Sequence, residues 1–302
     1  MSLSATFTSA KNILAIILSL IMLPLTLFSS TQSFEAKNED ELELSFSVLS
    51  DCHVEGNNYK TFEVLSEILR DAKGGKNTDA LVFLGDNTMN GQNIESTFFY
   101  GALKAVKPSD NILVAMGNHD VGNGEGDYEK LTKRFLNYNN AYLCANIDKP
   151  YYYRVIDGCY FIVLATEDST VNSMYISEVQ LEWLKDVLEE AKASNKPIFV
   201  FNHHPLEAVE GEDYTVLSEL LNDYDNLIYF YGHTHIDFSQ TSFSTVNGVD
   251  TVNLPRCTEH ATEGYDCGIG AVVEVYEDEV IVRIRDFYDH EWKDDFEMSY
   301  PV

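Results

Sequence analysis

The chain has 302 residues, and 45% of them are hydrophobic, which is enough to bury a full core in one large domain or two modest ones. Its 49 acidic and 20 basic residues give a formal charge of −29. A surface this acidic repels polyphosphate backbones, which argues against a role in binding DNA or RNA polymers. Five scattered cysteines without a CxxC pair do not make a disulfide scaffold, although a single Cys257–Cys267 disulfide stays open.

The N-terminal segment differs from the rest of the chain. The uncharged apolar run Ile13–Phe28 follows a lone cation, Lys11, and precedes a small polar stretch. Its length lies between that of a signal-peptide core, about 7–15 residues, and that of a membrane span, about 20 residues. We therefore predict that residues 1–33 are a signal peptide cleaved before Phe34 or, alternatively, an uncleaved signal anchor.

This segment determines the predicted location of the protein. Because the cation precedes the apolar run, the N-terminus should stay inside while the rest is exported. We predict an acidic linker over residues 34–42 and an extracytoplasmic domain, either secreted or anchored to the outer side of the cytoplasmic membrane. Any membrane contact would be made only by the uncleaved N-terminal segment, and the sequence predicts no oligomeric state.

From Leu44 onward, short apolar strands alternate with amphipathic helices. Apolar faces predict helices around Phe62–Leu69 and Leu181–Ala191, the second beginning at a capping box at Ser177. The alternation predicts an α/β fold in one domain over residues 43–302. Runs rich in β-branched and aromatic residues predict the strands Phe46–Leu49, Ala80–Leu84, Ile112–Ala115, Tyr160–Ala165, Ile198–Phe201, Leu227–Tyr231, Thr251–Leu254, Ile269–Val275 and Val280–Ile284.

Polar clusters directly follow five of these strands. Because ligands bind at the carboxyl ends of strands in α/β sheets, the five clusters should meet at one edge. Carboxylates, imidazoles and an amide oxygen suit divalent zinc, manganese or iron, and the absence of paired thiolates argues against a structural zinc site. The clusters are Asp51-Cys52-His53, Gly85-Asp86-Asn87, Gly117-Asn118-His119-Asp120, His203-His204 and Gly232-His233-Thr234-His235.

The spacing within the clusters favours two ions. Asp51 and His53 lie at i and i+2, so an extended strand end would place both side chains on one side, with Cys52 packing on the other. His233 and His235 repeat this spacing after Gly232, which allows the backbone to approach closely. The clusters together hold enough ligands for two metal ions, and the two oxygens of Asp86 are suited to bridge them.

In this order, the motifs D-x-H, G-D, G-N-H-D, H-H-P and G-H-x-H resemble those of the calcineurin-like metallophosphoesterase superfamily, over Phe46 to about His235. The resemblance implies a four-layer α/β/β/α sandwich with two mixed β-sheets and two divalent ions (Mn, Fe or Zn). It also implies a non-ligand catalytic histidine at His119, oriented by Asp120. The implied ligands are Asp51, His53, Asp86 and His235 for one ion, and Asp86, Asn118, His203 and His233 for the other.

One position departs from part of this superfamily. Purple acid phosphatases have a metal-ligating tyrosine three residues after the bridging aspartate, where this chain has Met89. The resemblance therefore favours the cyclic-nucleotide-phosphodiesterase-like members.

The predicted function is an exported phosphohydrolase that acts on small phosphomonoesters or phosphodiesters. A hydroxide bridging the two ions would attack phosphorus, and His119 would protonate the leaving group. A catalytically inactive surface binding module on the same fold, or a regulatory or structural subunit, is the alternative.

Several further residues receive a structural interpretation. We predict that His260 and His290 are hydrogen-bonded structural residues and that Asp289–Glu297 is a solvated face. Arg256 is expected to form a surface ion pair, with a phosphate contact as the alternative. Three acidic, glycine-containing loops should lie at the active edge, namely Gly122–Tyr128, Glu207–Tyr214 and Glu259–Cys267.

Overall fold

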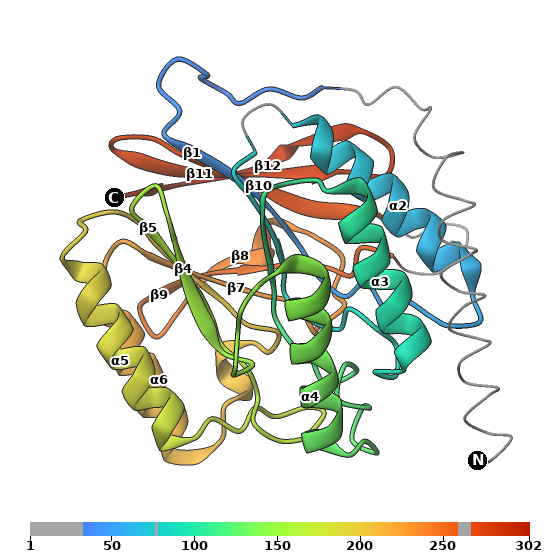
Figure 1. The fold of residues 1–302 in the computed structure, drawn as a ribbon. Coiled ribbons are helices and arrows are strands. Elements are labelled where there is room, and N and C mark those ends of the chain that lie inside the picture. Colours follow the sequence, from blue (N-terminus) through green and yellow to red (C-terminus); the bar gives the residue numbers. More distant parts are fainter. Residues whose placement is uncertain (1–32, 76–77, 259–266) are drawn as a thin grey trace, which may run out of the picture.

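Two six-stranded mixed β-sheets pack face to face in the computed structural model, which describes residues 33–75, 78–258 and 267–302 (Figure 1). Aromatic side chains from both sheets fill the space between them. Phe46 of the first sheet lies 4.8 Å, between ring centroids, from both Phe161 and Phe199 of the second. Helices cover the two outer faces, so the predicted four-layer α/β/β/α sandwich is confirmed.

The first sheet has the strand order β12-β11-β10-β1-β2-β3. Its first three strands along the chain are parallel, and the three C-terminal strands extend it in antiparallel fashion beyond β1. The strands are β1 (Leu44–Leu49), β2 (Ala80–Phe83), β3 (Asn111–Val114), β10 (Ile269–Val275), β11 (Glu279–Asp286) and β12 (Glu291–Pro301).

The second sheet has the order β4-β5-β6-β7-β9-β8. Four parallel strands form its centre, and an antiparallel strand closes each edge. The strands are β4 (Tyr152–Ile156), β5 (Cys159–Val163), β6 (Ile198–Phe201), β7 (Leu227–Tyr231), β8 (Phe243–Val246) and β9 (Val249–Asn253).

Five α-helices flank the sheets in the described part of the chain. The side chain of Asn58 caps the first of them, and that of Ser177 accepts a hydrogen bond from the backbone of Gln180, as its capping box predicts. The helices are α2 (Tyr59–Gly74), α3 (Asn93–Val106), α4 (Tyr128–Tyr138), α5 (Glu178–Lys192) and α6 (Gly211–Asn222), with short helical turns at Asn139–Leu143, Leu206–Ala208 and Gln240–Ser242.

All nine predicted strands are present within two residues of their predicted ends, but several elements were missed. The predicted loop Glu207–Tyr214 is partly wrong, because α6 begins within it at Gly211. The stretch Asp289–Glu297, predicted as a solvated face, largely belongs to β12. That strand lies at an edge of its sheet, where charged side chains face water and discourage further strand pairing.

The segment predicted as an acidic linker, residues 34–42, packs on the first sheet. Phe34 is 7% exposed, and its ring centroid lies 5.5 Å from that of Trp292 and 6.2 Å from that of Phe287. The backbone N–H of Lys37 donates to the buried carboxylate of Glu274 at 3.0 Å. These contacts attach the segment to the domain.

Two predictions fall outside the described residues. One is the apolar run Ile13–Phe28, and the other is His260 with most of the loop Glu259–Cys267. Among the residues that are described, no helix is long and apolar enough to cross a membrane.

Candidate metal centre

The predicted metal ligands come together between the two sheets, at the carboxyl ends of five strands. Three of these strands belong to the first sheet and two to the second, so the centre depends on how the two sheets pack. Asp51 and His53 follow β1, Asp86 follows β2, Asn118 follows β3, His203 follows β6, and His233 and His235 follow β7.

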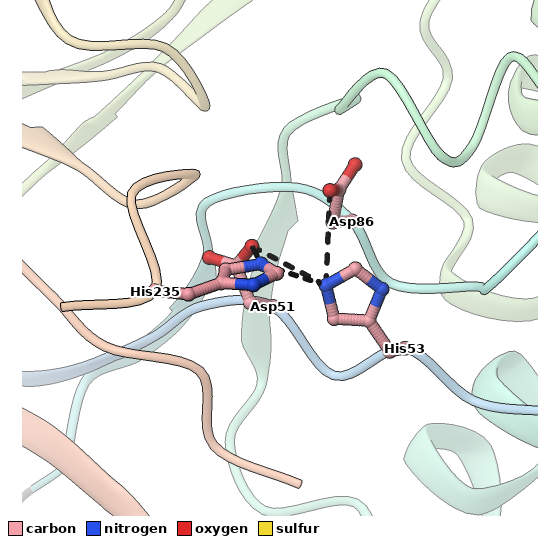
Figure 2. A group of neighbouring side chains, drawn as sticks. All are labelled: Asp51, His53, Asp86 and His235. Atoms are coloured by element: carbon pink, nitrogen blue, oxygen red, sulfur yellow. Dashed lines mark hydrogen bonds and ion pairs between the residues drawn. The ribbon is translucent and has the colours of Figure 1, made fainter. Parts of the chain in front are cut away.

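One group consists of Asp51, His53, Asp86 and His235 (Figure 2). The Nε2 atom of His235 lies 2.9 Å from Asp51 Oδ1 and 3.0 Å from His53 Nε2. His53 Nε2 is in turn 3.8 Å from Asp86 Oδ2. One ligand atom from each side chain lies within 4.8 Å of the others, so the four can reach a single ion.

A second group shares Asp86 and adds His203, His233 and Asn118. The Nε2 atom of His203 lies 3.1 Å from Asp86 Oδ2, 3.2 Å from His233 Nδ1 and 3.1 Å from Asn118 Oδ1. The neighbouring His204 instead has its Nε2 at 3.1 Å from the Val171 carbonyl. The structure thus assembles both sets of side chains that the sequence predicted, with Asp86 common to both.

The backbone is not extended at the two pairs Asp51/His53 and His233/His235, which corrects the reason given for their spacing. Five of the ligand residues have a left-handed backbone conformation, which residues other than glycine rarely adopt. Hydrogen bonds across the first sheet hold part of this conformation, because Asp51 N–H donates to the Gly85 carbonyl at 3.1 Å and His53 N–H to that of Asp86 at 2.8 Å. The φ angles are 54° at Asp51, 41° at His53, 50° at Asp86, 66° at His233 and 52° at His235.

Two glycines allow these loops to approach one another. A Cβ atom added at Gly232 would overlap Ser50 Oγ and the carboxylate of Asp51. At Gly117, a Cβ would overlap the carboxylate of Asp86. The close approach predicted for Gly232 is therefore confirmed, and Gly117 serves the same purpose at the shared aspartate.

Buried charge is concentrated at the centre. Burial alone would raise the pKa of Asp51 and Asp86, but nearby histidines, chiefly His203, hold both well below the usual range. Burial opposes protonation of His203, yet Asp86 and Asp51 raise its pKa to about 9. His233, penalised by burial and by the charge on His203, has its pKa lowered to about 4.

The donor set fits divalent metal ions. Two fully buried carboxylates have only histidines as charged partners in the described part of the chain. No Lys or Arg there supplies a permanent positive charge, although buried carboxylates need a counter-charge. Mixed nitrogen and oxygen ligands are those that zinc, manganese and iron accept.

His119 lies beside this centre and has a different partner from the predicted one. Its Nδ1 lies 2.7 Å from the Met89 carbonyl, and its ring centroid is 4.6 Å from that of His53. The predicted contact with Asp120 is wrong. The Asp120 carboxylate instead accepts hydrogen bonds from the backbone N–H groups of Gly117, Asn87 and Thr88. The side chains of Asn87 and Thr88 also donate to it.

A cavity of about 110 Å³ opens beside the first group of ligands. Its lining includes His53, His235, His119, Glu55, Met89 and Arg256. The structure places Arg256 at this cavity, and both the predicted ion pair and the alternative phosphate contact stay predictions. Its position agrees with the sequence pattern, because Arg256 follows β9 as the ligands follow their own strands.

A family model described as calcineurin-like phosphoesterase matches residues 44–237. The chain belongs to the calcineurin-like phosphoesterase family. As a member of it, the protein is a metal-dependent phosphoesterase, a hydrolase. None of the curated proteins compared matches the chain in sequence.

Solved structures show the same fold as this calcineurin-like phosphoesterase. A dimetal phosphatase from Danio rerio superimposes with a TM-score of 0.61 at 16% identity, over 86% of this chain and 99% of its own. A purple acid phosphatase from yellow lupin (Lupinus luteus) seeds gives 0.59 at 14% identity, over 85% of this chain and 53% of its own. A sulfate thiohydrolase from Thermus thermophilus gives 0.51 at 11% identity, over 84% and 58%.

Proposed function

We propose that this phosphoesterase binds two divalent ions and hydrolyses small phosphomonoesters or phosphodiesters outside the cytoplasm. The single observation that carries the proposal is the carboxylate of Asp86, which belongs to both groups of ligand atoms. One ion would be held by Asp51, His53, Asp86 and His235, and the other by Asp86, Asn118, His203 and His233. When bound, the ions would supply positive charge for the phosphate and lower the pKa of a water nucleophile to about 7.

Backbone groups around the centre fix where these ligands point. The backbone N–H of His119 donates to Asp86 Oδ1 at 2.8 Å, which orients the shared carboxylate. The backbone N–H of His233 donates to Asp51 Oδ2 at 3.1 Å. His203 Nδ1 lies 3.2 Å from the Leu84 carbonyl, which can only accept a hydrogen bond, so the proton belongs on Nδ1 and Nε2 is left for the ion.

His119 is positioned to transfer a proton. The Met89 carbonyl can only accept, so Nδ1 of His119 donates to it and Nε2 is the nitrogen that takes or gives the catalytic proton. His119 lines the cavity, and none of the described ligand groups uses its ring. We assign it the protonation of the leaving group, with the Met89 carbonyl as its positioning partner.

The cavity beside His119 is suited to the leaving-group side of a small phosphoester. Arg256 can donate to an anionic or carbonyl oxygen there, and Glu55 can accept from a hydroxyl. On a chain with a net charge of −29, the positive charge of Arg256, together with that of the bound ions, would attract an anionic substrate.

A substrate panel tests the activity. The purified chain should be reconstituted with Mn²⁺, Fe²⁺ or Zn²⁺ and assayed against an aryl phosphate, a bis-aryl phosphate, a cyclic nucleotide and a phospholipid. We expect metal-dependent release of product from at least one of the first three and about two ions per chain by elemental analysis. One ion or fewer per active chain would contradict the dinuclear centre.

The proposed location rests on the sequence of the N-terminal segment. The apolar run Ile13–Phe28 after Lys11 has the composition of an export signal. Phe34 is buried against Phe287 and Trp292, so a chain cleaved before Phe34 keeps these two contacts. Protease added to intact cells should release or degrade an anchored domain, whereas a cleaved domain should be found in the medium. A protected full-length chain inside the cytoplasm would contradict export.

A further inference from the structure

Two buried thiols meet next to the metal centre. Cys52 lies between Asp51 and His53, and Cys257 lies in the segment that follows β9. Their Sγ atoms are 3.3 Å apart although 205 positions separate them in the chain, and both residues are 0% exposed. A disulfide bond is about 2.05 Å long, so the sulfurs need to approach by roughly 1 Å.

The backbone already holds these two segments together. The N–H of Cys257 donates to the carbonyl of Ser50 at 3.0 Å. The hydroxyl of Thr258 donates to the carbonyl of Cys52. Hydrogen bonds therefore hold the segments together at both cysteines, so rotation of the side chains can supply most of the remaining approach.

The other cysteines lack such a partner. Cys144 is exposed, and Cys159 is buried at the start of β5. All five cysteines are free thiols in the structure, and Cys267, which the sequence allowed as a partner of Cys257, is only partly buried. Its neighbour Gly268 contacts Cys257 through a backbone hydrogen bond of 2.8 Å, but the sulfur in contact with Cys257 is that of Cys52.

We propose that Cys52 and Cys257 form a disulfide that joins the two β-sheets at the metal centre. Cys52 follows β1 of the first sheet, and Cys257 follows β9 of the second. The ligand groups draw side chains from both sheets, so their spacing depends on the sheets staying together. The disulfide ties the loop of Asp51 and His53 to the loop that carries Arg256.

The redox step needs an external disulfide. Each cysteine loses one proton, and the pair loses two electrons as the S–S bond forms. A thiol–disulfide oxidoreductase or oxidised glutathione accepts the electrons, its own S–S bond breaks, and two thiols are released. Because both cysteines are fully buried, the exchange takes place while the chain folds. The proposed export delivers the chain to compartments in which disulfides persist.

Peptide mapping tests the bond directly. The full-length chain is refolded in a mixture of oxidised and reduced glutathione, its free thiols are alkylated in denaturant, and the digest is analysed by mass spectrometry. We expect a Cys52–Cys257 peptide pair that reductant separates, with Cys144 and Cys159 alkylated. Alkyl groups on both Cys52 and Cys257, or a linked pair of Cys257 with Cys267, would overturn the proposal.

Thermal unfolding gives a second, independent measurement. Closing so long a loop should stabilise the fold, so reductant should lower the Tm of the oxidised wild type by about 5–15 °C. Cys52→Ala should remove this dependence on reductant, whereas the matched buried control Cys159→Ala should retain it in full. A Cys52→Ala protein with the wild-type shift would overturn the proposal. Metal-dependent activity of the reduced enzyme is measured in parallel, so that failure here leaves the phosphoesterase assignment standing.

Discussion

Two buried clusters of aspartate and histidine occur in this molecule, and they differ in what neutralises the carboxylates. At Asp71, the guanidinium of Arg285 donates through Nε at 2.6 Å and Nη2 at 2.9 Å. His290 Nδ1 lies 2.8 Å from the same carboxylate, which confirms the structural interpretation of that histidine. At the metal centre, Asp51 and Asp86 have no arginine or lysine partner among the described residues.

The difference shows how to distinguish a structural cluster from a metal site. Arg285 carries a permanent charge and fits one carboxylate with two parallel hydrogen bonds, so the Asp71 cluster is complete without any added group. The metal centre has only protonatable rings around two carboxylates. Divalent ions would supply a permanent positive charge there, whereas the histidines are positive only while they are protonated.

The largest effect should come from the shared aspartate. Asp86→Asn removes one charged ligand from both groups, so both ions should be lost. The phosphoesterase rate should decrease by more than about 10³-fold, which is more than the loss of a single electrostatic group usually causes. Elemental analysis and activity on an aryl phosphate provide the measurement. Full retention of one ion would show that Asp86 is not a bridge.

The matched substitution at the other cluster should have the opposite pattern. Asp71→Asn leaves Arg285 buried without its charged partner, which should cost about 3–5 kcal/mol of the free energy of unfolding. Metal content per folded chain should stay at the wild-type value. Urea unfolding measures the first quantity and elemental analysis of the folded fraction the second, and loss of metal here would remove the contrast between the clusters.

A substitution at His119 should change the reaction rate without changing the metal content. Since its ring lies outside both ligand groups, His119→Ala should keep both ions and lose about 10²–10⁴ in rate. The loss should be smaller for nitrophenyl esters, whose leaving group needs no proton, than for alkyl esters. Equal losses on the two ester classes would contradict the assigned role, and Asp120→Asn should not reproduce the leaving-group dependence.

Metal affinity should depend on pH through His203. In the metal-free protein its pKa is raised to about 9, and the ring must lose that proton to bind an ion. Affinity should therefore increase by about tenfold per pH unit up to about pH 9 and then level off. A competition titration with a chelator at several pH values measures this, and a flat profile between pH 7 and 9 would contradict it.

The same group predicts a change in stability with pH. Protonated His203 stabilises the metal-free fold below its unfolded pKa of about 6.5, and this contribution is lost as the pH rises towards 9. His233 acts at the other end, because its folded pKa of about 4 makes the fold less stable as the pH falls from 6.5. The Tm of the chelated protein should thus decrease on both sides of about pH 6.5.

The smallest effect is expected at the wall of the cavity. Arg256→Ala should raise KM by about tenfold with little change in kcat, since it removes one charged hydrogen bond to the substrate. Lys196→Ala is the control, because that lysine precedes β6 at the opposite end from His203 and pairs with Glu43 on the surface. An unchanged KM for Arg256→Ala would place the substrate elsewhere.

Much of the centre could be predicted from the sequence because its residues follow strands. Each cluster comes directly after an apolar run, and β-sheets bring strand ends together. The hydrogen bonds of Asp120 could not be predicted in this way. Its carboxylate accepts hydrogen bonds from Thr88 and Asn87. These two residues come close to Asp120 only because β2 and β3 pair.

The missed elements also have a physical explanation. β12 contains a run of charged residues, and as an edge strand it needs no continuous apolar face. The packing of Phe34 depends on residues more than 250 positions away, so nothing local distinguishes this segment from a linker. Patterns of apolar residues predict buried strands well, but they do not predict contacts that tertiary packing alone creates.

The left-handed backbone at five ligand residues has a consequence for protein engineering. Such conformations cost of order 1–3 kcal/mol each and persist only when surrounding structure imposes them. The backbone of the loops therefore determines the geometry of the centre, together with the glycines that let the loops approach, such as Gly232 and Gly117. Copying the ligand side chains alone onto the strand ends of another α/β scaffold should fail to reproduce the site, whereas transplanting whole loops with their glycines should retain it.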